Sequence, residues 1–387
     1  MVPSRRLLLP VVLAVTATLG ALALKSWCGT PGAGPDLYLR WCYSDVPPLW
    51  FVERLSEGAV PYLDHPVEYP VLTGLWMWLA GVPASSAGTF LLWTGLLLVG
   101  AAAGTAALLA DEVGLRRALA FAAAPTLLVS GAVNWDLPAV LLATGGIVAH
   151  RRARDGLAGT LLGLGTAAKL FPGLFLLPLA AAAWRLRGRK AGLVTVLAGA
   201  VAWWAVNLPV ALAAPASWLR FFELSRERPS DWDALTTVVM RTTGWAPDIG
   251  TLNLVTAVAF VLGVAAVAAV AVRRDPPVTW HLAALPLLAV FLLTSKVYSP
   301  QFSLWLLPLF ALSFPGWWWL AAFAVTDVAV TVTRFPYLAT FVDGGLEGAW
   351  PWEPFGIAIV ARAVVLAGAA WVGWRRAVRG TGSGAGA

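Results

Sequence analysis

Long apolar runs, separated by short polar breaks, limit what this chain can fold into. Of its 387 residues, 59% are hydrophobic and 12% are charged, whereas an ordinary soluble domain has roughly 45–50% apolar and about 25% charged residues. The 22 tryptophans and 16 phenylalanines supply ample surface for burial, which excludes a disordered chain. The sequence therefore predicts an all-α, polytopic transmembrane helical bundle and not a soluble enzyme.

The basic residues are grouped in short arginine-rich clusters between the apolar runs. The formal net charge of +7 would suggest a polyanionic partner in a soluble protein, but in a membrane protein such clusters mark the cytoplasmic side. No cluster is interleaved with aromatic residues on a polar surface, so we expect no nucleic-acid partner. The clusters are Arg116–Arg117, Arg151–Arg154, Arg185–Lys190, Arg273–Arg274 and Arg375–Arg379.

The alternation between these clusters and the other polar breaks predicts the topology. With the clusters in the cytoplasm and the other breaks outside, the chain makes about 12 crossings of the cytoplasmic membrane, and both termini are cytoplasmic. We interpret the run 7–24 as an uncleaved first span and not as a signal peptide, because its 18 residues approach the ~20 needed to cross. The outer breaks are 134–136, Lys169, 215–248, 296–301 and 334–353.

We interpret residues 1–387 as one integral membrane domain. An acidic first outer loop covers 25–68, a second large outer loop covers 215–248, and 380–387 form a flexible cytoplasmic tail. The run 69–82 has only 14 residues, about 21 Å of helix against a ~30 Å hydrocarbon core. We therefore expect an interfacial or re-entrant helix there.

Two predicted crossings, 137–150 and 157–168, are also short. Their outer ends should lie below the membrane surface in a recess lined by protein. This interpretation places Asn134, Asp136 and Lys169 in the recess. The alternative is that neighbouring pieces fuse into one long tilted helix, which would move a basic cluster to the wrong side.

Several polar residues have surroundings that suggest chemistry. Asp45 is the one carboxylate in Cys42-Tyr-Ser-Asp-Val-Pro-Pro-Leu-Trp, and it is either a solvated loop acid or a group that reaches a sugar hydroxyl. Lys169 and Lys296 each lie between apolar runs, where a lysine can simply extend to the lipid headgroups. Alternatively, the two lysines converge on a phosphate, joined by Arg226, Arg228, Tyr298, Ser299 and Gln301.

Two further pairs of residues have open interpretations. Cys28 and Cys42, in the first loop, form either a disulfide in an oxidising compartment or two unrelated thiols. Asp327 and Arg362 lie within the last apolar runs, and a structural ion pair between them is favoured over a proton relay. The three histidines are scattered and neither cysteine has a partner at ligand spacing, so no metal site is predicted.

Taken together, these motifs resemble the GT-C superfamily of membrane glycosyltransferases. The chain is most similar to glycosyltransferase family 87, which includes polyprenyl-phosphate-mannose-dependent mannosyltransferases of actinobacteria. No single motif is a strict signature, and the order and spacing carry the resemblance over most of the chain. The matching motifs are Cys42-Tyr-Ser-Asp-Val-Pro-Pro-Leu, Gly58-Ala-Val-Pro-Tyr62, Glu68-Tyr-Pro-Val-Leu-Thr-Gly74, Asn134-Trp-Asp-Leu, Lys169-Leu-Phe-Pro, Arg220-Phe-Phe, Arg226-Glu-Arg228 and Lys296-Val-Tyr-Ser-Pro-Gln301.

The resemblance implies roles for individual residues. In that superfamily an acidic residue of the first outer loop is the catalytic base, and Asp45 occupies that position here, with Asp36 as the second candidate. Glu68-Tyr-Pro-Val replaces a more frequent doubled proline, and the loop lacks an Asp-x-Asp pair, so neither a catalytic metal nor another cofactor is expected. The implied contacts to the donor phosphate and sugar are Glu68, Asn134, Asp136, Lys169, Arg226, Arg228, Lys296, Tyr298 and Gln301.

The resulting hypothesis is an inverting glycosyltransferase at the outer face of the cytoplasmic membrane. By the resemblance, it would move mannose from a polyprenyl-phosphate sugar, the donor lipid, to a hydroxyl of a glycolipid or lipoglycan acceptor. An arabinofuranose donor would meet the same phosphate contacts. Two other classes are a lipid-linked-sugar flippase or small-solute transporter, and a structural subunit without the chemistry. A transporter would have discontinuous helices in paired halves, whereas the unpaired polar residues here lie mostly on the outer side.

Overall fold

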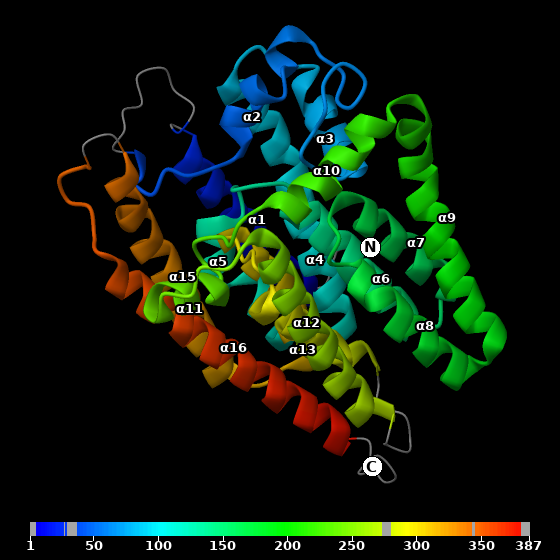
Figure 1. Cartoon of the computed structure of the whole chain (residues 1–387). Coiled ribbons are helices and arrows are strands. Elements are labelled where there is room, and N and C mark those ends of the chain that lie inside the picture. Colours follow the sequence, from blue (N-terminus) through cyan, green and yellow to red (C-terminus); the bar gives the residue numbers. More distant parts are fainter. Residues whose placement is uncertain (1–4, 27, 29–36, 273–279, 343–344, 381–387) are drawn as a thin grey trace.

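The computed structural model describes residues 5–26, 28, 37–272, 280–342 and 345–380, and this part of the chain is helical, without a β-strand. Five of the described helices contain segments long and apolar enough to cross a membrane (Figure 1). The predicted all-α, multi-pass class is therefore confirmed. These helices are α1 (Arg5–Lys25), α4 (Ala87–Ala122), α9 (Arg189–Ala213), α12 (Ile249–Val272) and α16 (Trp352–Gly380).

The other helices are shorter or more polar. Because a helix rises 1.5 Å per residue, most of them cannot be assigned as crossings by length, and the number of about 12 stays a prediction, as does the side on which each terminus lies. They are α2 (Val46–Val52), α3 (Val71–Gly81), α5 (Pro125–Ser130), α6 (Asp136–Arg151), α7 (Asp155–Ala168), α8 (Gly173–Arg187), α10 (Pro215–Glu227), α11 (Leu235–Thr243), α13 (Ala284–Thr294), α14 (Leu306–Ser313) and α15 (Trp317–Leu338), with 3₁₀ turns η2 (Leu55–Glu57), η3 (Trp280–Ala283), η4 (Pro300–Trp305) and η5 (Ala339–Phe341).

Helices α7 and α9 pack with their backbones in close approach. A Cβ atom at Gly159 would collide with the Thr195 carbonyl group, and one at Gly163 would collide with the Gly199 carbonyl group. Small residues four positions apart allow this contact between helices in a membrane. The packing fixes the outer end of α7, where Lys169 follows the last helical residue.

The first outer loop folds over one end of the bundle, where α2 and α3 lie at the top of Figure 1. A disulfide joins Cys28 to Cys42, so of the two interpretations of these cysteines the bridge is the one the structure contains. The Lys25 ammonium donates to the Trp41 carbonyl at 2.6 Å, which attaches the loop to the end of α1. Asp36 and residues 381–387 of the tail lie outside the described residues.

The short run 69–82 contains α3, which contacts the outer end of α7. The Thr73 hydroxyl donates to the Ala168 carbonyl at 2.7 Å, and the Tyr62 hydroxyl donates to the carbonyls of Tyr69 and Pro70, both at 2.9 Å. The bond to Ala168 satisfies a carbonyl at the C-terminal end of α7, where helical partners are missing. The position of α3 relative to the bilayer stays a prediction.

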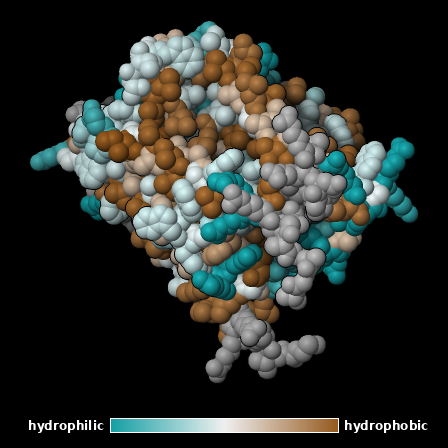
Figure 2. All heavy atoms as spheres, turned by 90° about the horizontal axis from the view of Figure 1, so that it is seen from below, coloured by the Kyte–Doolittle hydropathy of each residue, from teal (hydrophilic) through white to brown (hydrophobic). Residues whose placement is uncertain are grey.

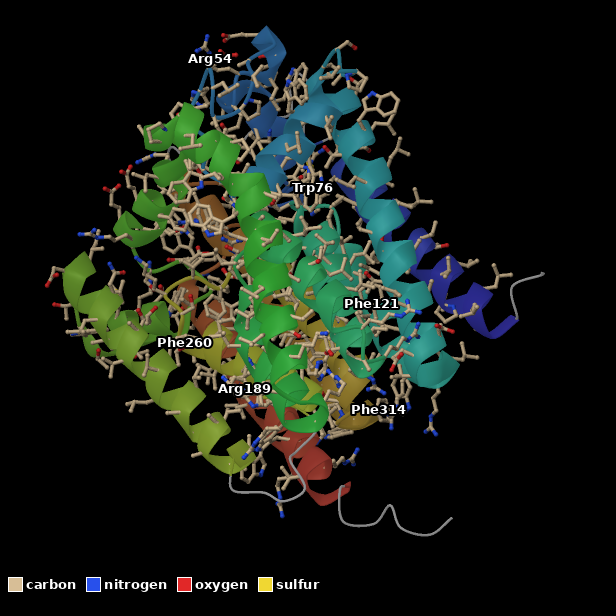
Figure 3. All side chains as sticks on the ribbon, turned by 90° about the vertical axis from the view of Figure 1, so that its right-hand side faces the viewer. Arg54, Trp76, Phe121, Arg189, Phe260 and Phe314 are labelled. Carbon is tan, nitrogen blue, oxygen red and sulfur yellow. A yellow bond between two sulfur atoms is a disulfide. The ribbon has the colours of Figure 1, made fainter. Side chains whose placement is uncertain are left out.

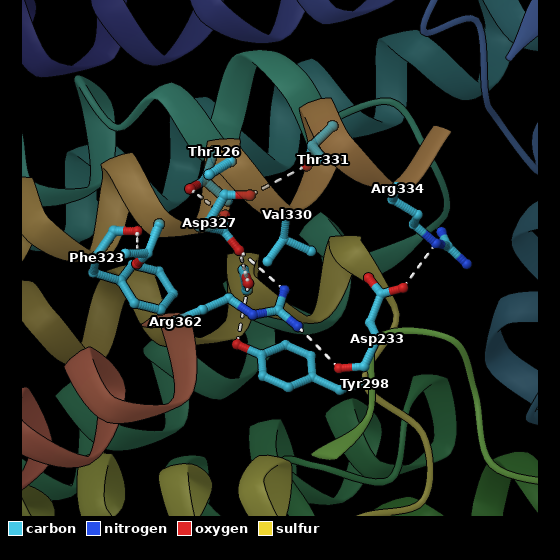
Figure 4. A network of polar contacts seen from close by, with 12 residues as sticks. Thr126, Asp233, Tyr298, Phe323, Asp327, Val330, Thr331, Arg334 and Arg362 are labelled. Atoms are coloured by element: carbon cyan, nitrogen blue, oxygen red, sulfur yellow. Dashed lines mark hydrogen bonds and ion pairs between the residues drawn. The ribbon is translucent and has the colours of Figure 1, made fainter. Parts of the chain in front are cut away.

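The ion pair predicted between Asp327 and Arg362 is confirmed. Arg362 Nη1 lies 3.3 Å from Asp327 Oδ1, and both side chains are almost fully buried (Figure 4). The prediction that Arg334 begins an outer break is wrong, because α15 continues to Leu338 and Arg334 is only 5% exposed. Its charge is compensated by tertiary contacts that the sequence does not display.

Many large apolar side chains of the helices are exposed. Seen from the end where α16 finishes, hydrophilic side chains form separate groups between apolar areas (Figure 2). Arg54 of the loop 25–68 and Arg189, which begins α9, lie toward opposite ends of the molecule (Figure 3). Which of these ends faces the cytoplasm stays a prediction.

Candidate active site

A cavity of about 380 Å³ lies where the loop before α3 meets the ends of several helices. Segments far apart in the sequence supply its polar wall, and aromatic and other apolar side chains supply the rest. Its lining is Tyr43, Asp45, Glu68, Tyr69, Pro70, Asn134, Lys169, Leu170, Phe171, Phe221, Leu224, Ser225, Arg228, Phe291, Ser295, Lys296, Val297, Ser299, Gln301, Phe302 and Trp305.

Asp45 is held in the cavity wall by the segment that precedes α6. Its backbone N–H donates to the Val133 carbonyl at 2.9 Å, and Asn134 Nδ2 donates to its Oδ2 at 2.7 Å. Burial together with the Asp45 charge raises the pKa of the nearby Tyr43. The Asp45 carboxylate is half-buried and oriented by the Asn134 amide, while Asp45 lines the cavity.

Asn134 connects Asp45 to a buried lysine. Its Oδ1 accepts from Lys169 Nζ at 3.2 Å, so a single side-chain amide contacts both groups. Lys169 Nζ also lies 3.7 Å from Asp136 Oδ2 and 5.0 Å from the centroid of the Tyr69 ring. Although its side chain is only 11% exposed, Lys169 lines the cavity as a cation opposite aromatic rings.

Lys296, on the segment after α13, and Arg228, which follows α10, form a second group of cations. Lys296 Nζ donates to the carbonyls of Arg226 at 3.1 Å and Arg228 at 2.6 Å. Burial and the nearby Arg228 lower the pKa of Lys296. Arg228 and Gln301 join Lys296 in the lining, so this wall combines two cations with an amide.

Three of the residues predicted for the site have side chains that do not line this cavity. Asp136 is fully buried behind Lys169 and accepts from Trp305 Nε1 at 2.7 Å. The Tyr298 ring lies under Arg362, 3.8 Å from its Cζ, and Arg226 contacts Lys296 through its carbonyl. Asp45, Glu68, Asn134, Lys169, Lys296, Arg228 and Gln301 do line the cavity.

Sequence reasoning missed the aromatic part of the site. The Trp305 ring stacks on Phe171 with ring centroids 4.3 Å apart and on Phe302 with centroids 4.0 Å apart. Tyr43 and Tyr69 also line the cavity. Both tyrosines lie within the matched motifs, which was the available signal, whereas nothing local distinguishes Trp305 from the other tryptophans of this chain.

The arrangement has the parts that group transfer to a hydroxyl requires. A carboxylate held at the wall of a cavity can serve as a general base, and the cations that line the same cavity can neutralise an anionic leaving group. Within the described residues, no group of three or more His, Cys, Asp or Glu side chains could hold a metal ion. The absence of a cofactor stays a prediction.

Comparison with known proteins assigns the chain to a class. The model of glycosyltransferase family 87 matches residues 67–295, more than half of the chain. The chain therefore belongs to this family and is a membrane glycosyltransferase. The match covers Glu68, Asn134, Lys169 and Arg228 but neither Asp45 nor Lys296.

The chain is also similar to a solved structure. ArnT from Cupriavidus metallidurans bound to undecaprenyl phosphate is similar at 13% identity and a TM-score of 0.47, over 96% of this chain and 78% of that chain. No curated protein matches the chain significantly.

Proposed function

We propose that the protein transfers a sugar, mannose in the first instance, from a polyprenyl-phosphate donor to a hydroxyl of a cell-envelope glycolipid or lipoglycan. The reaction takes place at the outer face of the cytoplasmic membrane. Membership of family 87 supports the reaction class. The observation that carries the proposal is the Asn134 side chain, which binds Asp45 through its nitrogen and Lys169 through its oxygen.

This shared contact brings a candidate base and a candidate phosphate ligand to the same cavity. Asp45 takes the proton of the acceptor hydroxyl as its oxygen attacks the anomeric carbon. The bond from that carbon to the phosphate oxygen breaks on the opposite face, and its electron pair stays with the departing lipid phosphate. A single displacement of this kind inverts the configuration at the anomeric carbon.

The leaving phosphate gains charge in the transition state and needs preorganised cations. Lys169, Lys296 and Arg228 line the cavity and supply them, and Gln301 adds a hydrogen-bond donor. Because the leaving group is a lipid, the cavity also needs an apolar side. Phe221 and Leu224 of α10 and other apolar side chains of the lining provide it.

The experiment is transfer from labelled polyprenyl-phosphate mannose by the purified protein in lipid nanodiscs, with an envelope lipid extract as acceptor. Asp45→Asn should lower transfer by about 10²–10⁴-fold, which is the usual contribution of a general base, without changing the melting temperature. Glu57→Gln, an exposed acid of the same loop that pairs with Arg54, is the matched control and should keep full activity.

Three outcomes of this assay would contradict parts of the proposal. Normal turnover by Asp45→Asn removes the base assignment. Transfer from polyprenyl-phosphate arabinofuranose but not from the mannose donor would show that the donor sugar is arabinofuranose. The proposed mechanism would be unchanged. Movement of the donor across the membrane without a new glycoconjugate would indicate transport and refute glycosyl transfer altogether.

A further inference from the structure

A buried ion network beside the cavity has no role in the mechanism given above. Arg334, near the end of α15, has a side chain that is 6% exposed, and its Nε lies 2.7 Å from Asp233 Oδ1 (Figure 4). Its Nη2 lies 3.8 Å from Asp231 Oδ1. Burial raises the pKa of Asp233 to about 7, and Arg334 opposes that rise. A buried guanidinium needs such partners. These two carboxylates, however, contact only the Nε and Nη2 atoms of Arg334.

The other side of the guanidinium faces the first outer loop. Arg334 Cζ lies 5.6 Å from the centroid of the Tyr43 ring, which in turn packs against Phe335 with ring centroids 5.2 Å apart. Within the described part of the chain, Arg334 Nη1 is buried without a hydrogen-bond partner. The Asp45 charge acts on both Tyr43 and Arg334, so the Tyr43 ring links the guanidinium to the candidate base.

Asp231 extends the network to the cation side of the cavity. Its backbone N–H donates to the Lys296 carbonyl at 2.8 Å, and its Oδ2 accepts from the Ser299 hydroxyl at 2.8 Å. Both Lys296 and Ser299 line the cavity. Asp231 thus holds the segment 296–299 by two bonds and contacts Arg334 through its second carboxylate oxygen.

We propose that Arg334 is a positioning residue that keeps the two sides of the cavity in register. It acts on Asp45 through Tyr43, and on Lys296 and Ser299 through Asp231. The proposal rests on the proposed function for the roles of Asp45 and Lys296. A guanidinium suits this position because its planar fork can contact two carboxylates while its face packs on an aromatic ring.

The kinetic test compares Arg334→Met and Arg334→Lys with the wild type. Arg334→Met should lower kcat about tenfold or more while the donor KM changes by less than about twofold, because the cavity residues remain but are no longer held in register. Arg334→Lys keeps the charge but not the planar fork, so its kcat should also stay low.

Arg187→Met is the control for loss of a paired arginine, because Arg187 pairs with Asp155 and is not part of the network around Asp231 and Asp233. It should keep the wild-type kcat and KM. If Arg334→Met shows wild-type kcat while Asp45→Asn is inactive, the positioning role is wrong and the proposed function stands. An equal fall of kcat in Arg187→Met would also refute the positioning role, because the effect would then come from general loosening.

A second measurement does not depend on transfer. In a thermal double-variant cycle, Arg334→Met and Tyr43→Leu should together lower the melting temperature by less than the sum of the single changes. Additive losses would overturn the proposed link. If Arg334→Met does not fold, Arg334→Lys replaces it in the cycle. Absence of transfer by the wild type from any polyprenyl-phosphate sugar would refute the proposed function, and this cycle would still decide the link.

Discussion

Two ion pairs in this protein, Asp327 with Arg362 and Asp136 with Lys169, have similar chemistry and different surroundings. Asp327 accepts hydrogen bonds from Thr126, Ser303 and Arg362, so both of its oxygens have partners. Asp136 accepts from Trp305 through Oδ1, but its Oδ2 has only the Lys169 ammonium at 3.7 Å and no hydrogen bond within the described residues.

The difference separates a structural pair from one beside a site. A fully satisfied pair has no capacity left for a ligand, and it joins helices. Lys169 instead divides its contacts between Asp136 and Asn134 and lines the cavity. An anion in the cavity would give this ammonium a third partner, whereas nothing from the cavity reaches Arg362.

Glu53, in the first outer loop, is a third buried carboxylate. Within the described residues, neither of its oxygens has a hydrogen-bond partner. Its side chain is 1% exposed, and the imidazole nitrogen His65 Nε2 lies 3.4 Å from its Oε2. Burial and the nearby Glu68 raise the pKa of Glu53 to about 7. The three carboxylates therefore differ in how well their charge is compensated, and this difference can be tested.

Lys169→Met should give the largest change in activity. If the ammonium stabilises the departing phosphate, transfer falls by about 10²–10³-fold, as for the loss of one preorganised charge contact. The measurement is kcat and donor KM in the nanodisc assay. Lys190→Met, at the start of α9, is the control for loss of a lysine, and unchanged kinetics of Lys169→Met would make Lys169 a structural partner of Asp136 only.

Arg362→Met should give the largest change in stability. Removal of one partner leaves Asp327 buried without its cation, which costs about 3–5 kcal/mol of unfolding free energy. The double change Arg362→Met with Asp327→Leu should recover much of this loss, since no isolated charge remains. Denaturant titration in detergent measures both, and a single variant as stable as the wild type would show that the pair contributes nothing.

Glu53→Gln should have the smallest effect, confined to a pH window. The pKa of Glu53 in the folded protein is about 7, above its ordinary value of 4.5, so its favourable contribution is complete below pH 4.5 and is lost as the pH rises through 7. Above pH 7, Glu53→Gln should therefore be more stable than the wild type by about 1–3 kcal/mol.

Thermal melts of both proteins between pH 4.5 and 8.5 test this window. Glu57→Gln, a change of an exposed acid in the same loop, should follow the wild type at every pH. Parallel curves for the wild type and Glu53→Gln would show that the Glu53 carboxylate is solvated in the folded protein.

Much of the fold was predictable because the signals are local. The apolar runs and arginine clusters predicted a helical membrane protein, and the ordered motifs predicted the family. The short lengths of 137–150 and 157–168 also placed Asn134 and Lys169 in a recess, where both line the cavity. Arg334 was misplaced because hydropathy alone cannot show that a charge at the end of a span has aspartates from a distant loop around it.

The order of apolar runs, arginine clusters and motifs was enough to assign the class of protein and most of the residues among which the site lies. Which of those residues share a cavity wall depends on the tertiary structure. Asp136 and Tyr298 belong to matched motifs but lie behind the cavity, whereas Trp305, which belongs to none, lines it. The physical reason is that membrane insertion depends on the summed hydropathy of a segment, whereas the direction of one side chain depends on which helices pack around it.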